Sequence, residues 1–226
     1  MVWRPRSAPP HVRVSFSAIL RIRDDDGIVL FEARSRPGAY TPPGGVYKYF
    51  GPATDVLDRL GFHGDRWTDR ESDMRNDIRG VLPARSVPEF LRWFDSGAYR
   101  EDSDECLRRE LTEELTEVGF PALAADVANL SFAHLRTEVE GPTPVAGKPY
   151  RQLRRFEFHD MVCANQQAVR LRDRILELAA DPHVQTVLAA TSADITHGRA
   201  GKALVAPHAA YLTGGTRTRS DIPSLR

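Results

Sequence analysis

Residues 101–119 have the sequence EDSDECLRRELTEELTEVG, which decides how the whole chain is interpreted. Four apolar residues recur there at helical spacing and predict a buried stripe: Leu107, Leu111, Leu115 and Val118. Asp102 and Glu105 form a capping signature at the start, and Gly119 offers an end. We therefore expect a helix over Ser103–Glu117.

A row of glutamates follows the adjoining face of this helix at spacings of three and four residues: Glu110, Glu113, Glu114 and Glu117. Like charges so placed repel by about 0.2–0.5 kcal/mol per pair, so the row weakens the helix unless cations neutralise it. Hard divalent ions such as Mg²⁺ and Mn²⁺ prefer carboxylate oxygens and bridge them to phosphates. A charge run is more often a solvated face, and we keep that interpretation for Glu117. For the other three glutamates the arrangement favours metal binding, because an arginine precedes the first and an acidic pair follows it.

Six residues of this helix resemble the centre of the Nudix box, whose full pattern is Gx5Ex7REUxEExGU, with U a bulky apolar residue. They run from Arg109 to Glu114 and read RELTEE. Glu101 stands eight residues before Arg109, at the place of the box's first glutamate. Two glycines of the pattern are missing, since Asp95 and Thr116 occupy their places. Because a later glycine ends this helix, the loop after it should differ from that of the family.

The glycine turn that normally opens the box lies far upstream in this chain. In the family it is a Pro-Gly-Gly turn directly before the helix, and here Pro43-Gly44-Gly45 supplies it. The resemblance thus implies that residues 46–97 are inserted between the turn and the acidic helix. This arrangement resembles one branch in particular, the SMODS-associated Nudix domains found beside bacterial nucleotide-messenger defence systems. That resemblance covers roughly residues 12–165 and rests on short segments near the box: PPGGVYKY at 42–49, DIR at 77–79, FLRWF at 90–94, and Arg100-Glu101.

The resemblance implies an α/β fold of the Nudix type, an α/β/α sandwich with a mixed sheet. It also implies that Glu110, Glu113 and Glu114 bind Mg²⁺ or Mn²⁺. Arg109 would orient a glutamate through a salt bridge, so the implied catalytic residues are Glu113, Glu114 and Arg109. A bound ion would neutralise a diphosphate and lower the pKa of a water that attacks phosphorus. The base that takes the proton is left open between a glutamate near the ion and one on a loop.

Five further residues are candidates for substrate binding, and each has a structural alternative. Gly44 and Gly45 either let the backbone approach a phosphate or the metal, or simply form a tight turn. Tyr47 and Lys48 offer a stacking face and a cation for a base and a phosphate, unless their segment is an ordinary strand that buries them. Arg79 suits a phosphate but fits an exposed strand face as well.

Two other sets of side chains fit structural roles better than chemical ones. Three arginines near a predicted strand are more often an exposed sheet face than a phosphate site: Arg151, Arg154 and Arg155. The histidines do not have the spacing of a metal site, so structural or surface roles are favoured for His134, His159, His197 and His208.

Hydrophobic periodicity and turn residues predict the remaining elements. Strands are expected at 12–23, 28–33, 46–50, 78–82, 130–138 and 151–163, with a hairpin turn at 24–27. Helices are expected at 53–60, 88–94 and 169–180, the second opened by a capping box of Ser86 and Glu89. Irregular loops are expected at 34–45, 63–76 and 141–149, a helical turn at 186–190, and a final strand or helix at 203–212. The expected Nudix domain covers 12–212, with a flexible arm at 1–11 and a tail at 213–226.

Composition limits the classes of partner. Lysine and arginine number 31, as do aspartate and glutamate, so no overall field points to a DNA or RNA duplex or to a membrane. The chain begins without the apolar core of a signal peptide, and no apolar run approaches the roughly 20 residues that cross a bilayer. Cys106 and Cys163 lie far apart, which excludes a disulfide framework and fits a reducing cytoplasm. We therefore expect a soluble cytoplasmic protein.

The leading hypothesis is a Mg²⁺-dependent Nudix hydrolase of a nucleotide or nucleotide-derived diphosphate, acting in bacterial nucleotide-messenger signalling against phage. The rival hypothesis is a sensor that binds a cyclic oligonucleotide messenger without cleaving it, because fold alone does not decide function. A purely structural module would leave the acidic row unexplained. A homodimer is kept as an alternative because Nudix relatives often dimerise, although no stretch shows an obvious self-complementary surface.

Overall fold

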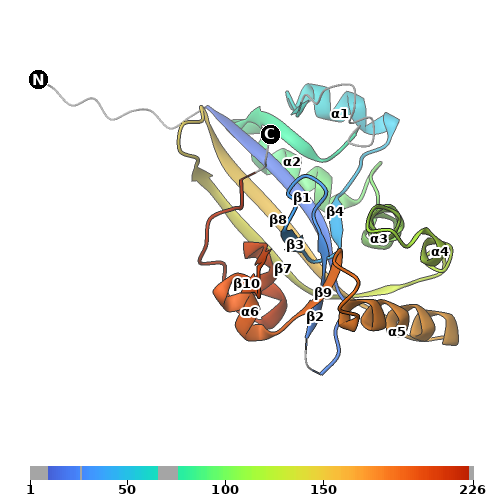
Figure 1. Cartoon of the computed structure of the whole chain (residues 1–226). Helices are drawn as coiled ribbons and strands as arrows, with labels where there is room; N and C mark the ends of the chain where they lie inside the picture. The colour runs from blue at the N-terminus through green and yellow to red at the C-terminus, as the bar shows by residue number, and fades with distance from the viewer. Residues whose placement is uncertain (1–9, 26, 66–75, 224–226) are drawn as a thin grey trace, which may run out of the picture. The chain divides into compact units, whose positions relative to one another are not determined.

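The structure is a computed structural model that describes residues 10–25, 27–65 and 76–223 (Figure 1). The chain divides into two compact units. Unit 1 comprises Met1–Ser17, Val46–Asp102 and Glu138–Phe156, and unit 2 comprises Ala18–Gly45, Ser103–Thr137 and Glu157–Arg226. Three long strands contribute residues to both units: β1 (His11–Arg21), β7 (Phe132–Pro144) and β8 (Tyr150–Met161).

Strand β1 forms where the sequence alternates between apolar and polar residues. Val12 and Val14 are buried while the residues between them are partly exposed, as a half-buried strand requires. In the second half of the strand Ser17 and Ile19 are buried as well, so both faces are covered there. The strand was predicted from the sequence at 12–23, and this prediction is confirmed.

Unit 1 combines short antiparallel strands with two helices. β6 (Arg79–Pro83) pairs with the first half of β1, with Val12 opposite Leu82, and β5 (His63–Gly64) pairs with β6. The helices are α1 (Thr54–Arg59), after the 3-10 turn η1 (Gly51–Ala53), and α2 (Val87–Ser96), after the 3-10 turn η3 (Ala84–Ser86). The predicted helices at 53–60 and 88–94 and the predicted strand at 78–82 are therefore confirmed.

Aromatic rings form the core of unit 1, and α2 supplies three of them, Phe90, Trp93 and Phe94. Phe94 has no exposed surface, and its ring lies edge-on at 4.7 Å from that of Phe16 and 5.3 Å from that of Tyr47. Phe90, one turn earlier, stacks on Phe62 at 5.8 Å. Such pairs add to the free energy gained by burial alone, so this cluster holds α2 in place.

The capping box predicted at the start of α2 is wrong. The Ser86 side chain makes no capping hydrogen bond, because its backbone (φ −85°, ψ −11°) is already helical as the last residue of η3. An N-cap normally has an extended backbone that turns its side chain toward the first free N–H groups. The far end of α2 follows the usual rule, with Gly97 in the left-handed region (φ 71°).

Unit 2 contains a five-stranded mixed sheet in the order β10-β11-β3-β2-β9. Its strands are β2 (Ile28–Glu32), β3 (Ala39–Thr41), β9 (Val187–Ala190), β10 (Arg199–Ala200) and β11 (Ala203–Val205). β11 runs parallel to β3, and the other neighbours are antiparallel. The second sheet has the order β5-β6-β1-β8-β7, with β4 (Gly44–Val46) paired to β1 off this path. The predicted mixed α/β fold is confirmed.

The helices of unit 2 are α3 (Ser103–Glu117), α4 (Pro121–Ala124), α5 (Gln166–Ala180) and α6 (Ser192–His197), followed by the 3-10 helix η4 (Pro207–Thr213). α5 packs along β9 and β2, and α4 packs against α3 (Figure 1). Asn165 caps α5, since its side chain accepts a hydrogen bond from the Ala168 N–H. α3 has the predicted bounds, and Gly119 behind it has a positive φ of 98°.

The segment 186–190 was predicted as a helical turn, and this is wrong. Val187–Ala190 is strand β9, which pairs antiparallel with β2 so that Ile28 faces Ala190 and Phe31 faces Val187. A run of four small or apolar residues does not show a period of its own, so the pairing with β2 decides its conformation.

Two predicted loops also contain strands. Residues 34–45, expected to be irregular, hold β3 and most of β4. The loop expected at 141–149 is shorter, because β7 continues to Pro144 through a cis bond between Gly141 and Pro142. The end expected at 203–212 as a strand or a helix contains both, namely β11 and η4.

Some predictions lie outside the described residues. They concern the arm at 1–9, Asp26 in the hairpin turn, most of the polar loop at 63–76, and the last residues 224–226. In the described part of the chain, no helix combines the length and the apolar character needed to cross a membrane.

Replacing Phe94 by alanine should destabilise the protein by about 3–5 kcal/mol, because the substitution opens a cavity at the centre of the unit 1 core. Urea unfolding followed by circular dichroism measures the change. Phe50→Ala is the matched control, since the Phe50 side chain is 44% exposed and its loss should cost less than about 1 kcal/mol. Equal losses in the two variants would contradict this account of the core.

Candidate functional site

Helix α3 carries the acidic row on the face that adjoins its buried stripe. Cys106, Leu107, Leu111 and Leu115 are buried along one side of the helix. Glu110, Glu113 and Glu114 remain partly accessible, and Glu117 is exposed. The helix packing therefore leaves the glutamates at the surface of unit 2, where they can meet a ligand.

Arg109 lies among the glutamates rather than apart from them. Its guanidinium is 2.6 Å from a carboxylate oxygen of Glu110 and 3.6 Å from one of Glu113. The Arg109 side chain is 20% exposed, so these ion pairs are partly shielded from solvent. One cation thus sets the direction of two carboxylates of the row.

The glycine turn is attached to α3 at three points. The Gly44 N–H donates to Oε2 of Glu114 at 2.9 Å, and the Cys106 thiol lies 3.8 Å from the Gly45 carbonyl oxygen. The Glu110 carboxylate occupies the space that a Cβ on Gly45 would need. The structure therefore brings the upstream turn onto the acidic helix, although 57 residues separate Gly45 from Ser103 at the start of the helix, all of them in unit 1.

The two glycines serve different needs. Gly44 has a φ of 128°, and a Cβ there would collide with the backbone of Ala18 and Ile19 on β1. Gly45 would meet only the end of the flexible Glu110 side chain. Gly44 is thus required by the fold, whereas Gly45 leaves room for a carboxylate of the site.

Charge accumulates along the row. The pKa of Glu114 is raised well above its ordinary value, chiefly because burial disfavours the charged form. The negative charge of Glu110, and to a smaller extent those of Glu117 and Glu113, raise this pKa further. The hydrogen bond from the Gly44 N–H lowers it. A cation placed at this row would relieve the repulsion.

The donor chemistry of the trio fits an oxygen-preferring divalent ion. Carboxylates are the ligands that Mg²⁺ and Mn²⁺ select, and burial together with the negative charge of Glu110 raises the pKa of Glu114. Across residues 10–25, 27–65 and 76–223, no three His, Cys, Asp or Glu side chains already stand as a ready metal-binding group. Glu113, whose side chain is 42% exposed, has the room to turn toward its neighbours.

The other candidates belong to unit 1. Glu101 is buried, its carboxylate accepts the Lys48 N–H at 2.9 Å, and its own N–H donates to the Lys48 carbonyl. Tyr47 is fully buried beside Phe94, so it lies in the core of unit 1. Arg79 lies on β6 opposite Ser15 and is partly exposed.

The three arginines of the first half of β8 are engaged inside unit 1. Arg155 forms an ion pair with Asp95 at 2.6 Å, and Arg154 lies 3.5 Å from Glu140. Arg151 donates to the Pro142 carbonyl. These contacts agree with the structural role that we favoured for them.

One residue near the row, Arg34, was not identified from the sequence. Arg34 lies 3.0 Å from Glu117, the glutamate we interpreted as merely solvated, and both line a pocket beside the end of α3. Arg34 belongs to a segment predicted as a loop, and no pattern in the sequence links it to a residue 83 positions away. A spacing argument could not have found it.

His159 is buried on β8, with its ring 5.3 Å from that of His134. Its pKa is lowered, chiefly by burial. Among the smaller effects, the nearby His134 ring also lowers this pKa. The Glu157 carbonyl oxygen, 3.1 Å from Nδ1, and the charges of Glu157 and Asp104 raise it. The structural role expected for this histidine agrees with its position.

Comparison with known families gives one match. The family described as the SMODS-associated NUDIX domain matches residues 11–213, which is most of the chain. No curated protein matches the sequence.

The substitutions Gly44→Ala and Gly45→Ala should separate stability from metal binding. Gly44→Ala should lower the free energy of unfolding by about 1–3 kcal/mol, because it strains the backbone and meets β1. Gly45→Ala should leave stability nearly unchanged but weaken Mg²⁺ binding by about 10-fold or more, since it displaces the Glu110 carboxylate. Urea unfolding measures the stability of each variant, and calorimetric titration measures its Mg²⁺ affinity. If the two variants lost stability and affinity equally, the different roles assigned to Gly44 and Gly45 would be contradicted.

His159 should make the protein less stable in acid. Because its folded-state pKa lies below the ordinary value of 6.5, the unfolded chain takes up a proton first as the pH falls. The free energy of unfolding should therefore fall below about pH 6.5, by up to about 1.4 kcal/mol per pH unit, and stay unaffected above it. His159→Gln should flatten this part of the pH profile, and the exposed His197→Gln should not. A slope unchanged in His159→Gln would refute the assignment.

Proposed function

This chain belongs to the SMODS-associated Nudix family, and on that premise we propose that it hydrolyses a nucleotide or nucleotide-derived diphosphate with Mg²⁺ or Mn²⁺. The observation that carries the proposal is the trio Glu110, Glu113 and Glu114 on one side of α3, with the glycine turn held against it. The same proposal places the protein in the bacterial cytoplasm, in nucleotide-messenger signalling against phage. Cys106 and Cys163 form no disulfide, which supports a reducing compartment.

Each residue of the site has a distinct part in this proposal. Glu110, Glu113 and Glu114 bind the ion, and Arg109 keeps the first two directed by its ion pairs. The Gly44 N–H holds one oxygen of Glu114, which leaves its other oxygen for the ion. The ion, when bound, would neutralise the diphosphate and make a water more acidic. Arg109 thus acts on the reaction through the glutamates, as a positioning residue.

The proposal extends to the organisation of the chain. We assign the Nudix domain to residues 12–212 and regard 46–97 as an insertion between the glycine turn and α3. Lys48 and Arg79 are proposed to contact substrate phosphates, for which their positive charge is suited. A homodimer also belongs to the proposal.

The main competing function is a sensor that binds a cyclic oligonucleotide without cleaving it. The family description, SMODS-associated, favours a messenger nucleotide as ligand but does not say whether it is cleaved. Both functions predict nucleotide binding, and only hydrolysis requires the carboxylates for turnover. Product formation is therefore the measurement that separates them.

Glu113→Gln and Glu114→Gln should each lower turnover by at least about 100-fold, because loss of a metal ligand should cost no less than loss of its supporting partner. Purified protein would be incubated with Mg²⁺ or Mn²⁺ and a panel of linear nucleotide diphosphates and cyclic oligonucleotides. Products would be followed by chromatography and binding by calorimetry. Glu177→Gln on α5 is the control, since Glu177 is an exposed glutamate paired with Arg174.

The outcomes separate the two functions. Metal-dependent cleavage that both variants lose establishes the hydrolase. Cleavage that persists in both variants rejects the proposed role of the trio. Tight binding of a cyclic oligonucleotide by the unmodified protein, without any product, establishes the sensor instead.

A further inference from the structure

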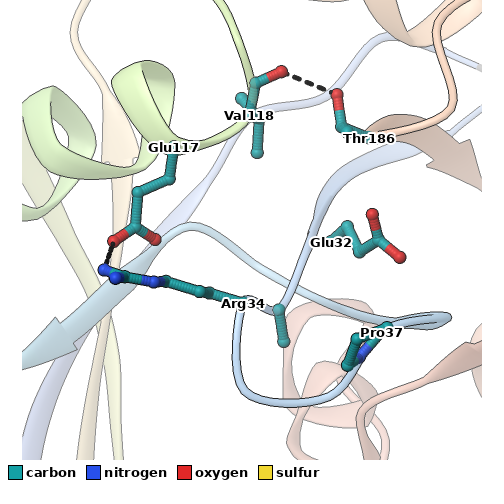
Figure 2. A pocket seen from close by; sticks show the side chains of 7 residues that line it. Glu32, Arg34, Pro37, Glu117, Val118 and Thr186 are labelled. Carbon is teal, nitrogen blue, oxygen red and sulfur yellow. Dashed lines mark hydrogen bonds and ion pairs between the residues drawn. The ribbon is translucent and has the colours of Figure 1, made fainter.

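A pocket of about 340 Å³ opens beside the C-terminal end of α3, and all of its lining residues belong to unit 2 (Figure 2). It is formed by the loop after β2, by the last turn of α3 and by the residue before β9. The lining consists of Glu32, Ala33, Arg34, Pro37, Glu117, Val118 and Thr186. This volume lies at the lower end of the range for small-molecule sites.

The pocket continues the line of the glutamate row. Along α3, Glu110 lies against Gly45, Glu114 accepts from Gly44, and Glu117 pairs with Arg34. The helix rises about 1.5 Å per residue, so Glu117 lies only about 4.5 Å further along the axis than Glu114. A ligand whose phosphates lie over the trio can therefore reach this pocket with its next group.

The walls of the pocket are fixed by hydrogen bonds of the backbone and of two side chains. The Glu32 carboxylate accepts the Gly38 N–H at 2.7 Å, which closes the loop that carries Ala33 and Pro37. On the opposite side the Thr186 hydroxyl donates to the Val118 carbonyl at 2.8 Å (Figure 2). These two hydrogen bonds hold the backbone on opposite sides of the pocket.

The lining suits a flat ring with hydrogen-bond donors at its edge. Ala33, Pro37 and Val118 offer apolar surface. Glu117 offers a carboxylate: one oxygen faces the Arg34 guanidinium, and the other is turned across the pocket in Figure 2. A carboxylate accepts hydrogen bonds and donates none, so it favours an amino group over a carbonyl oxygen.

We propose that this pocket holds the base of a nucleotide that bears an exocyclic amino group, with Glu117 accepting a hydrogen bond from it. The inference rests on the proposed function, because the phosphates must lie over the trio for the base to reach the pocket. The side chains of Arg34 and Glu117 are 72% and 40% exposed, and an ion pair this exposed is weak enough to rearrange around a ligand. Glu117 then determines specificity and takes no part in the chemistry.

Two substitutions test the proposal by different routes. Ala33→Leu fills the pocket with a larger side chain at a partly exposed position, which limits the cost to folding. Glu117→Gln keeps the shape of the pocket and removes its preference for donors, since a glutamine amide both donates and accepts. The controls are Ala180→Leu and Glu177→Gln, both at exposed positions of α5.

The binding of CDP, UDP and inorganic pyrophosphate would be measured by calorimetry on the full chain with Ca²⁺, a hard ion that takes oxygen ligands. Chromatography would verify that each ligand stays intact. CDP and UDP are the informative pair, because an amino group in the first replaces a carbonyl oxygen in the second. CDP should bind at least about 10-fold more tightly than pyrophosphate, since the base adds contacts that pyrophosphate lacks.

Each variant has a defined expectation. Ala33→Leu should remove the advantage of CDP over pyrophosphate and leave the affinity for pyrophosphate unchanged. Glu117→Gln should reduce the preference for CDP over UDP by at least about fivefold. The two controls should retain both preferences.

Failure of this inference is distinguishable from failure of the proposed function. If pyrophosphate binds with the ion and CDP binds no more tightly, or if both pocket variants behave like the controls, the base lies elsewhere and the inference is overturned. If pyrophosphate does not bind in the presence of the ion, the site on α3 fails and the proposed function falls with it.

Discussion

The hydrogen bond from the Gly44 N–H to the Glu114 carboxylate joins segments 70 residues apart, and the candidate site depends on it. It places a backbone donor where the glutamate row is most buried. A partly buried carboxylate with negative neighbours is unfavourable unless a donor or a cation faces it. The glycine turn supplies the donor, and the proposed ion would supply the cation.

Close approach of other atoms to the backbone explains why two glycines stand in this turn. At Gly44 the constraint is the β1 backbone, and at Gly45 it is the Glu110 carboxylate. The acidic helix and the turn are therefore sterically complementary. The glutamate side chains of the helix occupy space that the missing side chains of the turn leave empty. Arg109 completes the arrangement by pairing with Glu110 and Glu113.

The same segment that carries the glycine turn also shapes the neighbouring pocket. From Arg34 to Gly45 the chain follows the glutamate row, first beside Glu117 and then beside Glu114 and Glu110. A ligand that extends along α3 would thus meet acids on the helix and loop residues opposite them. The proposed metal site and the proposed base pocket are therefore neighbouring parts of one surface in unit 2.

The sequence by itself determined the acidic helix, its bounds, its buried stripe and the long strand β1, because these patterns repeat within one or two turns or along one strand. It also identified both parts of the candidate site, since the glycine turn and RELTEE are local motifs. The strands β3 and β9 and the pairing of Arg34 with Glu117 were decided only by the tertiary structure. Strands of three or four residues have too little pattern to identify them and gain their hydrogen bonds from distant partners. An ion pair across 83 residues likewise exists only after the chain has folded, because its two ends share no spacing that a sequence can show.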